Sequence, residues 1–267
     1  MTVPSEPNIS PSSHGGGTSP MIYRDLVIIT NDQVGESFLL AVDKRTGQEK
    51  WRIDRESVDN GTAYAVPSVY EEPGQNPQLI FASRADGLSG VDPETGKTIW
   101  KVKDLFPLRV VFSPLVVGDL VFAGCGQGGG GKRFAAVRPG SSDGKRPAGI
   151  AYELKNALPY VPTPVSYGNL VFIVNDGTGV GTCFDAASGA VKWKERLGGS
   201  FFGSPVCIDG KIYLISKKGE VIVFKASDSF EPLARNDLGE MSYTTPAVAG
   251  SALYLRTRHH LISVGGK

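Results

Sequence analysis

The chain has 267 residues, of which 40% are hydrophobic and 21% charged, and its formal net charge at pH 7 is +1. No run of lysine and arginine exceeds two residues, so the chain lacks the electrostatic signature of phosphate-backbone binding, and nucleic acid is not an expected partner. No stretch of 18 apolar residues occurs, so no membrane-spanning segment is expected.

The N-terminal segment differs in composition from the rest of the chain. Residues 1–18 are rich in proline, serine and glycine and show no strand pattern. They are predicted to be disordered or extended, ahead of a single domain that covers residues 19–267. The segment has neither a basic start nor an apolar core, so no signal peptide is visible and the sequence leaves the compartment open. Cys125, Cys183 and Cys207 are an odd number of scattered cysteines, which argues against a disulfide framework.

The rest of the chain repeats a pattern centred on proline. A small residue or valine precedes a proline six times, at intervals of 41 to 50 residues, and in most copies two apolar runs separated by a tight polar turn follow. The prolines are Pro20, Pro67, Pro114, Pro164, Pro205 and Pro246. The turns Gly118-Asp119, Gly168-Asn169, Asp209-Gly210 and Gly250-Ser251 are two-residue hairpin signals, so each repeat is predicted to begin with two antiparallel strands.

A second pattern marks the later part of three repeats. An aspartate is followed four residues later by glycine and eight residues later by tryptophan, in Asp43/Gly47/Trp51, Asp92/Gly96/Trp100 and Asp185/Gly189/Trp193. The aspartate can accept hydrogen bonds from amides two or three residues on, and the glycine suits a positive φ. The pattern therefore predicts a tight bend between a third and a fourth strand. The tryptophans of the outermost strands are predicted to pack against the neighbouring repeat.

Self-similarity at this period predicts a repeat architecture. The fold is therefore predicted to be an all-β propeller of six recognisable four-stranded blades. The third repeat has Tyr152 at the tryptophan position, and the sixth ends at LISVGGK without a fourth strand. The sequence leaves open an imperfectly closed ring or an open, N-terminally short arc, whose exposed sheet edges would favour self-association or a partner's strand. The segment GQGGGGKR (126–133) is interpreted as a loop between strands, because Arg133 replaces the hydroxyl residue of a phosphate loop.

The Asp-x-x-Thr/Ser-Gly-x-x-x-Trp pattern resembles the repeat of the PQQ-like β-propellers, the quinoprotein alcohol dehydrogenase-like superfamily, which includes BamB-like proteins and has a WD40-like design. The resemblance covers the chain from about Pro20 onward. It implies tryptophan docking between adjacent blades and a ring of seven or eight blades. It also implies a bacterial protein of the cell envelope or periplasm.

Two functions from different classes follow from the resemblance. Quinoprotein dehydrogenases of the superfamily have adjacent cysteines, calcium ligands and a catalytic aspartate. This chain has no adjacent cysteines and no recognisable calcium-ligand set, so no catalytic, cofactor-binding or metal-binding residue is predicted and PQQ is not expected. The favoured function is a non-catalytic scaffold that binds a protein or peptide partner through the channel mouth or an exposed blade edge. The alternative is a quinone- or small-molecule-binding redox protein.

The predicted binding residues come from two loop classes that share one face of a propeller. An aromatic residue stands shortly before the proline in five repeats, and basic or amide residues occupy the loop between the second and third strands. The predicted rim is Tyr64, Arg84, Arg109, Phe112, Tyr160, Asn175, Phe202, Lys217, Tyr243 and Arg256. Aromatic and arginine side chains are frequent interface anchors. The alternative is that these aromatic rings only fill the funnel and pack the blade tops.

Overall fold

The computed structural model describes residues 17–33, 35–56, 62–128 and 130–265, and every regular element among them is a β-strand. The predicted propeller fold is confirmed, because the strands form six antiparallel sheets in chain order, five with four strands and one with three. The chain divides into two compact units, residues 1–153 and 154–267. The assignment of 19–267 to one domain stays a prediction. The predicted segment 1–18 lies outside the described residues except for its last two.

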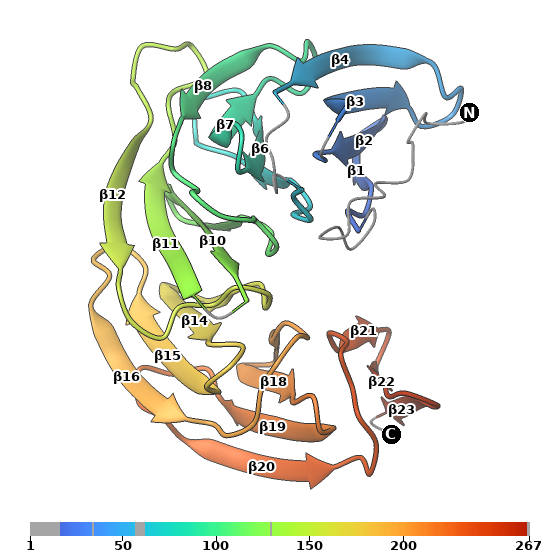
Figure 1. Ribbon diagram of the computed structural model, residues 1–267, viewed down its shortest axis with the longest axis vertical. Coiled ribbons are helices and arrows are strands. Elements are labelled where there is room, and N and C mark those ends of the chain that lie inside the picture. Colours follow the sequence, from blue (N-terminus) through green and yellow to red (C-terminus); the bar gives the residue numbers. More distant parts are fainter. Residues whose placement is uncertain (1–16, 34, 57–61, 129, 266–267) are drawn as a thin grey trace. The chain divides into compact units, whose positions relative to one another are not determined.

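Unit 1 contains three four-stranded sheets, in each of which the strand order follows the chain (Figure 1). Sheet 1 consists of β1 (Met21–Tyr23), β2 (Leu26–Asn31), β3 (Ser37–Asp43) and β4 (Glu49–Arg55). Sheet 2 consists of β5 (Ser68–Tyr70), β6 (Gln78–Ser83), β7 (Gly87–Val91) and β8 (Thr98–Val102). Sheet 3 consists of β9 (Leu115–Val117), β10 (Leu120–Gln127), β11 (Gly130–Arg138) and β12 (Gly149–Leu154).

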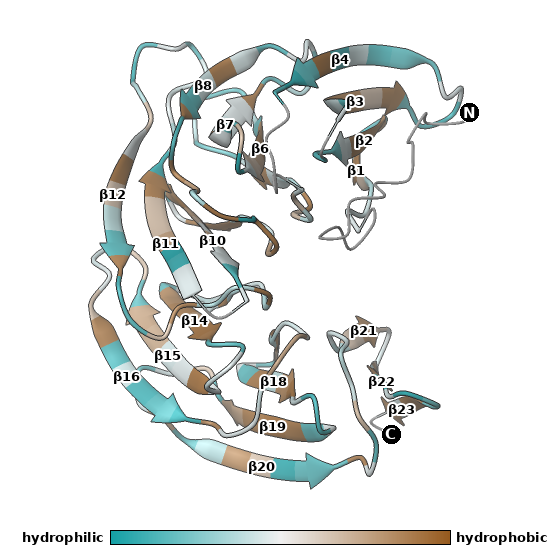
Figure 2. Cartoon of the chain, in the orientation of Figure 1, coloured by the Kyte–Doolittle hydropathy of each residue, from teal (hydrophilic) through white to brown (hydrophobic). Residues whose placement is uncertain are grey.

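Unit 2 contains two four-stranded sheets and one three-stranded sheet. Sheet 4 consists of β13 (Val165–Tyr167), β14 (Leu170–Val174), β15 (Val180–Asp185) and β16 (Val191–Arg196). Sheet 5 consists of β17 (Val206–Ile208), β18 (Lys211–Ile215), β19 (Glu220–Lys225) and β20 (Pro232–Asp237). Sheet 6 consists of β21 (Ala247–Ala249), β22 (Ala252–Arg256) and β23 (Leu261–Gly265). In both four-stranded sheets the third strand is mostly buried and the outer strand is mostly exposed and hydrophilic (Figure 2).

The predicted two-residue hairpins are confirmed by the strand registers. Val117 pairs with Leu120 across the Gly118-Asp119 turn, and the other three turns also close between directly paired residues. Asp209 and Gly210 both have positive φ, 50° and 68°, as a type I′ turn requires.

The three Asp–Gly bends share one geometry. Asp43 Oδ1 accepts hydrogen bonds from the backbone amides of Arg45 and Thr46 at 3.0 and 2.9 Å and from the Thr46 hydroxyl at 3.0 Å. Gly47 has a φ of 72° and donates its amide to the Asp43 carbonyl at 2.8 Å. Asp92 with Gly96 and Asp185 with Gly189 form the same kind of bend. Each bend thus places the following strand on the outer side of its sheet.

Each tryptophan joins two neighbouring sheets of one unit. Trp51 is buried and donates its Nε1 hydrogen to the Pro93 carbonyl at 2.8 Å, in the bend of sheet 2. A Cβ atom at Gly96 would lie 2.8 Å from that indole, so the glycine also leaves room for the ring. In unit 2, Trp193 donates to the Ser227 carbonyl at 3.0 Å, just after β19 of sheet 5. The indole of one sheet therefore rests on the bend region of the next.

Two positions of the pattern differ in detail. Trp100 donates to Gln78 Oε1 of its own sheet at 2.5 Å, while its ring lies against Gly140, which follows β11 of sheet 3. Tyr152, at the tryptophan position of sheet 3, meets the ring of Phe122 edge-on at 6.3 Å. A tyrosine there packs within its own sheet instead.

A β-bulge precedes the tryptophan in each sheet that carries one. Ala41 pairs with Trp51 and Val42 pairs with Glu49, so Lys50 has no opposite residue. The bulge recurs in sheets 2 and 4, and also in sheet 5, which has no tryptophan. A bulge bends the strand and increases its twist, so this outer-strand curvature belongs to the blade design and not to the indole.

The interpretation of GQGGGGKR (126–133) as a loop is wrong. Gly126 and Gln127 belong to β10, residues 130–133 belong to β11, and Gln127 pairs directly with Gly130. The glycines extend a hairpin because antiparallel pairing satisfies their backbone groups. Sheet 6 has three strands among the described residues, as the sequence predicted. The choice between an open arc and a closed ring concerns the placement of the two units and stays a prediction.

Candidate partner-binding surface

The predicted rim residues of unit 1 are largely covered. Phe112 is 1% exposed and its ring lies 5.9 Å from that of Phe134, so its assignment to an exposed rim is corrected to the core. Arg109 is also buried, whereas Tyr64 and Arg84 are half-buried. These four residues therefore give unit 1 little aromatic surface for a partner.

Two predicted residues of unit 2 stabilise its first loops. Asn175 Oδ1 accepts hydrogen bonds from the amides of Gly177 and Thr178 at 3.1 and 2.9 Å, and its Nδ2 donates to the Leu158 carbonyl at 2.8 Å. The backbone amide of Tyr160 donates to Asp176 Oδ1 at 3.1 Å. The polar groups of Asn175 are thus used within the loops.

The structure brings three other predicted residues together. The rings of Phe202 and Tyr243 lie 5.6 Å apart, and they are 43% and 49% exposed as whole residues. Lys217 Nζ lies 4.2 Å from the Phe202 ring centroid and 5.6 Å from that of Tyr243. This is cation–π distance for the first ring and close to its limit for the second. The result is an exposed aromatic pair with an ammonium group above it.

Backbone hydrogen bonds hold these loops side by side. The Lys217 amide donates to the Ser200 carbonyl at 2.8 Å, and the Ser242 amide donates to the Lys217 carbonyl at 3.3 Å. The Arg258 amide donates to the Met241 carbonyl at 2.9 Å. Four segments from sheets 4, 5 and 6 are therefore tied into one surface, which we call the unit 2 loop surface. It consists of Phe202, Lys217, Lys218, Arg256, Arg258 and residues 241–244.

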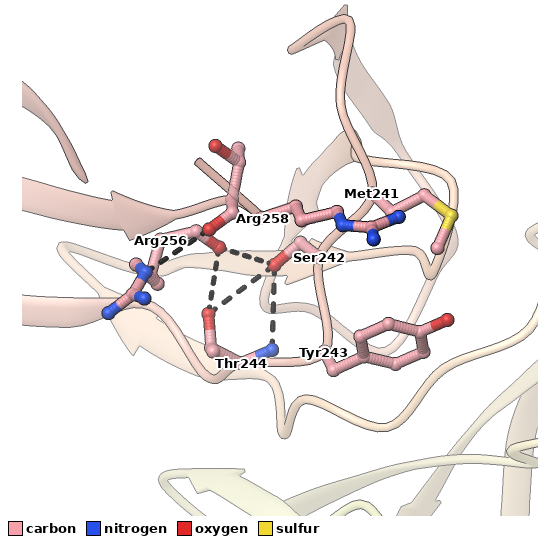
Figure 3. A pocket seen from close by; sticks show the side chains of 7 residues that line it. Met241, Ser242, Tyr243, Thr244, Arg256 and Arg258 are labelled. Atoms are coloured by element: carbon pink, nitrogen blue, oxygen red, sulfur yellow. Dashed lines mark hydrogen bonds between the residues drawn. The ribbon is translucent and has the colours of Figure 1, made fainter. Parts of the chain in front are cut away.

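A pocket of about 540 Å³ opens on this surface. It is lined by Met241, Ser242, Tyr243, Thr244, Arg256, Thr257 and Arg258. The Ser242 and Thr244 hydroxyls both donate to the Arg256 carbonyl, at 2.7 and 3.0 Å. These bonds hold the two lining segments together. Figure 3 shows the Arg258 side chain extending toward Met241, whereas the Arg256 guanidinium points the opposite way. Sequence analysis left Met241, Ser242, Thr244 and Thr257 out of the rim, because only the register of the loops brings them there.

Glu240 anchors the turn that carries the two arginines. Its carboxylate accepts hydrogen bonds from the Thr257 hydroxyl at 2.7 Å and the His259 amide at 3.1 Å, and it lies 2.6 Å from His260 Nδ1. The bonds from Thr257 and His259 lower the pKa of Glu240 from 4.5 to about 2. The carboxylate is therefore ionised at neutral pH, and the turn between β22 and β23 is fixed by it.

Two glycines permit the close approach of these loops. A Cβ atom at Gly203 would lie 2.1 Å from the Thr244 carbonyl oxygen, and one at Gly219 would lie 1.8 Å from that of Glu240. Gly219 also has a φ of 91°, which side chains resist. Larger residues at either position would push apart the segments that bear Phe202, Lys217 and Tyr243.

The unit 2 loop surface carries unneutralised positive charge. Lys218, Arg256 and Arg258 are exposed, and Lys217 is half-buried. Within the described part of the chain, no carboxylate forms an ion pair with any of the four. Their charges are therefore available to a ligand.

Unit 1 contains a buried charge cluster that was not among the predicted site residues. Arg55 Nε lies 3.1 Å from Asp32 Oδ1 and 2.9 Å from Asp86 Oδ2, and Lys101 Nζ lies 2.7 Å from Asp86 Oδ1. The Arg55 guanidinium also donates to the Ser83 hydroxyl. The two aspartates stand at different distances from the preceding prolines, so no repeat spacing could have paired them.

The two aspartates of this cluster differ in pKa, because the neighbouring cations contact them unequally. Burial raises the pKa of Asp32 to about 6, since Arg55 compensates only partly. Burial also acts on Asp86, but the hydrogen bond from Lys101 and the charge of Arg55 outweigh it and lower the pKa of that carboxyl. Asp32 is thus the weaker acid.

Among the described residues no group of three or more His, Cys, Asp or Glu side chains could hold a metal ion, and no helix is long and apolar enough to span a bilayer.

Comparison with known proteins gives two findings. A family model described as outer membrane protein assembly factor BamB matches residues 10–229 and 153–264. The crystal structure of BamB from Moraxella catarrhalis resembles this chain with a TM-score of 0.64 and 17% sequence identity, over 91% of this chain and 74% of that chain. At this identity the structural likeness shows the fold alone. No curated protein matches the chain.

Proposed function

This chain belongs to the family of outer membrane protein assembly factor BamB, and from that premise we propose that it is a protein-interaction scaffold that binds its partner through the unit 2 loop surface. The observation that carries the proposal is the exposed pair of Phe202 and Tyr243 beneath Lys217. A partner protein that covers these rings removes apolar area from water at a site already ordered by neighbouring loops.

The supporting argument is preorganisation. Backbone hydrogen bonds at Lys217, Ser242 and Arg258 fix the segments on which the anchors stand. A partner therefore needs to order few side chains on this surface when it binds, and less binding free energy is lost to conformational entropy. The pocket next to Tyr243 offers a concave place for one partner side chain.

The exposed edge of sheet 6 is a second candidate surface. Its last strand, β23, exposes Leu261 and Val264, and no described strand pairs with its outer side. Such an edge can accept an extended segment of a partner or of a second copy. Light scattering at high concentration tests self-association by this route. A monomer throughout would exclude a second copy at this edge.

The alternative function is that of a quinone- or small-molecule-binding redox protein. No contact among the described residues indicates this function. Titration of the purified protein with a quinone and calcium, followed by its visible absorption spectrum, tests it directly. The scaffold proposal expects no stoichiometric quinone spectrum. A stoichiometric spectrum would replace it with the redox function.

Site-specific photocrosslinking tests the scaffold function. A photoreactive phenylalanine at position 243 would be compared with one at position 167, because Tyr243 and Tyr167 are 49% and 51% exposed and only the first lies on the proposed surface. In native cells, position 243 should crosslink to one defined protein and position 167 should not. Equal labelling from both positions, or none from position 243, would refute the assignment of the surface.

A further inference from the structure

We infer that the unit 2 loop surface recognises an acidic segment of the partner protein, with one apolar side chain of that segment in the pocket beside Tyr243 and its carboxylates on Lys217, Arg256 and Arg258. The inference rests on the proposed function and deepens it by naming the partner's chemistry.

Charge complementarity is the first argument. The acids closest to the surface in the chain are already engaged: Glu240 accepts from Thr257 and His259, and Glu220 pairs with Arg235 at 2.9 Å. The cations of the surface have no such partner among the described residues. Arginine in particular can bind a carboxylate with two parallel hydrogen bonds. An anionic partner therefore meets cations that have no carboxylate partner among the described residues, and it does not have to break an internal ion pair there.

The composition of the pocket is the second argument. Its side walls include the thioether of Met241 and the ring of Tyr243, and the Arg258 guanidinium extends along them (Figure 3). A volume of about 540 Å³ lies in the range of ordinary ligand pockets. It accommodates an aromatic or branched aliphatic side chain against apolar walls. A purely ionic ligand, such as free phosphate, would leave those walls in water.

A second pocket in unit 2 limits where the acidic part of the partner segment can lie. This pocket of about 520 Å³ is lined by Gly199, Ser216, Lys218 and Gly239 of the loops and by Glu220 and Asp237 at the ends of β19 and β20. Asp237 repels carboxylates there, whereas Glu220 is paired with Arg235 at 2.9 Å and Lys218 is the cation that lines the hollow. The acidic part of the segment is thus kept out of this second hollow, which fits a neutral or polar continuation.

Fluorescence polarisation with synthetic peptides tests the inference on the full chain. The first probe is a labelled nine-residue peptide with a central phenylalanine flanked by two acidic residues on each side. The comparison probes replace the acids by their amides, or the phenylalanine by alanine. The acidic peptide should bind. Replacement of the phenylalanine should weaken binding about tenfold, as expected for loss of one anchor, and replacement of all four acids should weaken it at least as much. Binding should also weaken as salt is raised.

Matched variants locate the binding site. Arg258→Gln and Tyr243→Ala should each weaken binding of the acidic peptide about fivefold to tenfold. Arg196→Gln, which removes an exposed arginine on the outer strand β16, should change it less than twofold. Circular dichroism confirms that each variant is folded, and Lys217→Gln provides a second reading at the same surface.

The outcomes of these experiments distinguish the acidic-segment inference from the proposed scaffold function. Equal binding of the acidic and amide peptides, or equal effects of Arg258→Gln and Arg196→Gln, would overturn the acidic-segment inference even if position 243 crosslinks to a partner. Tighter binding to anionic phospholipid vesicles or single-stranded DNA than to the peptide would overturn it in favour of those ligands. Selective peptide binding without any crosslink in cells would support the surface chemistry and refute the proposed cellular role.

Discussion

The loop ends of the two units use similar side chains in opposite ways. Among the aromatic residues before the prolines, Phe112 of unit 1 is 1% exposed, whereas Phe202 and Tyr243 of unit 2 are 43% and 49% exposed. The cations differ in the same direction. Arg55 in unit 1 is buried between Asp32 and Asp86, whereas Arg258 in unit 2 is exposed without a described carboxylate partner. The repeat therefore supplies the side chains, and their neighbours decide whether they stabilise the fold or face a ligand.

The physical reason is desolvation. A buried guanidinium is tolerated only with nearby counter-charges, and it cannot exchange them for a ligand without a large loss of free energy. An exposed guanidinium is hydrated and exchanges water for a carboxylate at little cost. Four predictions test this difference between the two units.

The largest expected effect is at Arg55. Arg55→Met leaves Asp32 and Asp86 buried without the shared cation, so it should lower the free energy of unfolding by about 3–5 kcal/mol in urea denaturation. The control Arg138→Met removes an exposed pair with Asp119 and should cost at most about 1 kcal/mol. Similar losses of unfolding free energy in the two variants would show that the unit 1 charge cluster does not stabilise the fold.

Substitution of Trp193 tests whether the side chains of unit 2 are packed as tightly as those of unit 1. Trp193→Ala should lower the free energy of unfolding by about 3 kcal/mol, because it removes the indole that contacts Phe224 and Phe230 at 5.6 and 5.1 Å. Trp193→Phe, which keeps most of the apolar area, should cost clearly less. A negligible loss for the alanine variant would mean that the exposed rings of unit 2 reflect loose packing and not a binding surface.

Gly203 tests the geometry of the loop surface. Gly203→Ala places a methyl group against the Thr244 carbonyl and should cost about 1–3 kcal/mol of stability. It should also weaken acidic-peptide binding by displacing Tyr243. Gly177→Ala is the control, because its Cβ atom would meet only Asn175 Oδ1 at 3.7 Å, and it should leave peptide binding unchanged. Normal peptide binding by folded Gly203→Ala would separate the pocket from the Phe202–Tyr243 contact.

The smallest expected effect is a pair of opposite pH dependences. The pKa of Asp32 is raised from 3.8 to about 6, so its contribution to stability is fully present below pH 3.8 and is lost as the pH rises through 6. The pKa of Glu240 is lowered from 4.5 to about 2, so its contribution is present above pH 4.5 and is lost as the pH falls toward 2.

Urea midpoints measured between pH 2 and 8 check these signs. Relative to the unsubstituted chain, Asp32→Asn should remove the decline between about pH 4 and 6, and Glu240→Gln should remove the decline below about pH 4.5. The same sign of change for both variants would contradict the assignment of Asp32 to a desolvated site and Glu240 to a hydrogen-bonded one.

The architecture of a single blade follows from its local sequence. Local hydrogen bonds and hairpin turns need only residues close in the chain, so the Asp43–Thr46–Gly47 bend and the Asp209-Gly210 turn could be predicted from their spacing. Sheet 6, which has three strands among the described residues, could likewise be predicted from its sequence pattern. The family pattern added the packing of tryptophans on the next blade.

Only the folded chain shows which of these side chains form a surface. The burial of Phe112, the pairing of Arg55 with Asp32 and Asp86, and the pocket between residues 241–244 and Arg258 depend on contacts between segments that are separated in the chain. Similar side chains meet different neighbours, because loop lengths differ from blade to blade. Exposure and desolvation are properties of those neighbours, and no periodicity in one chain encodes them.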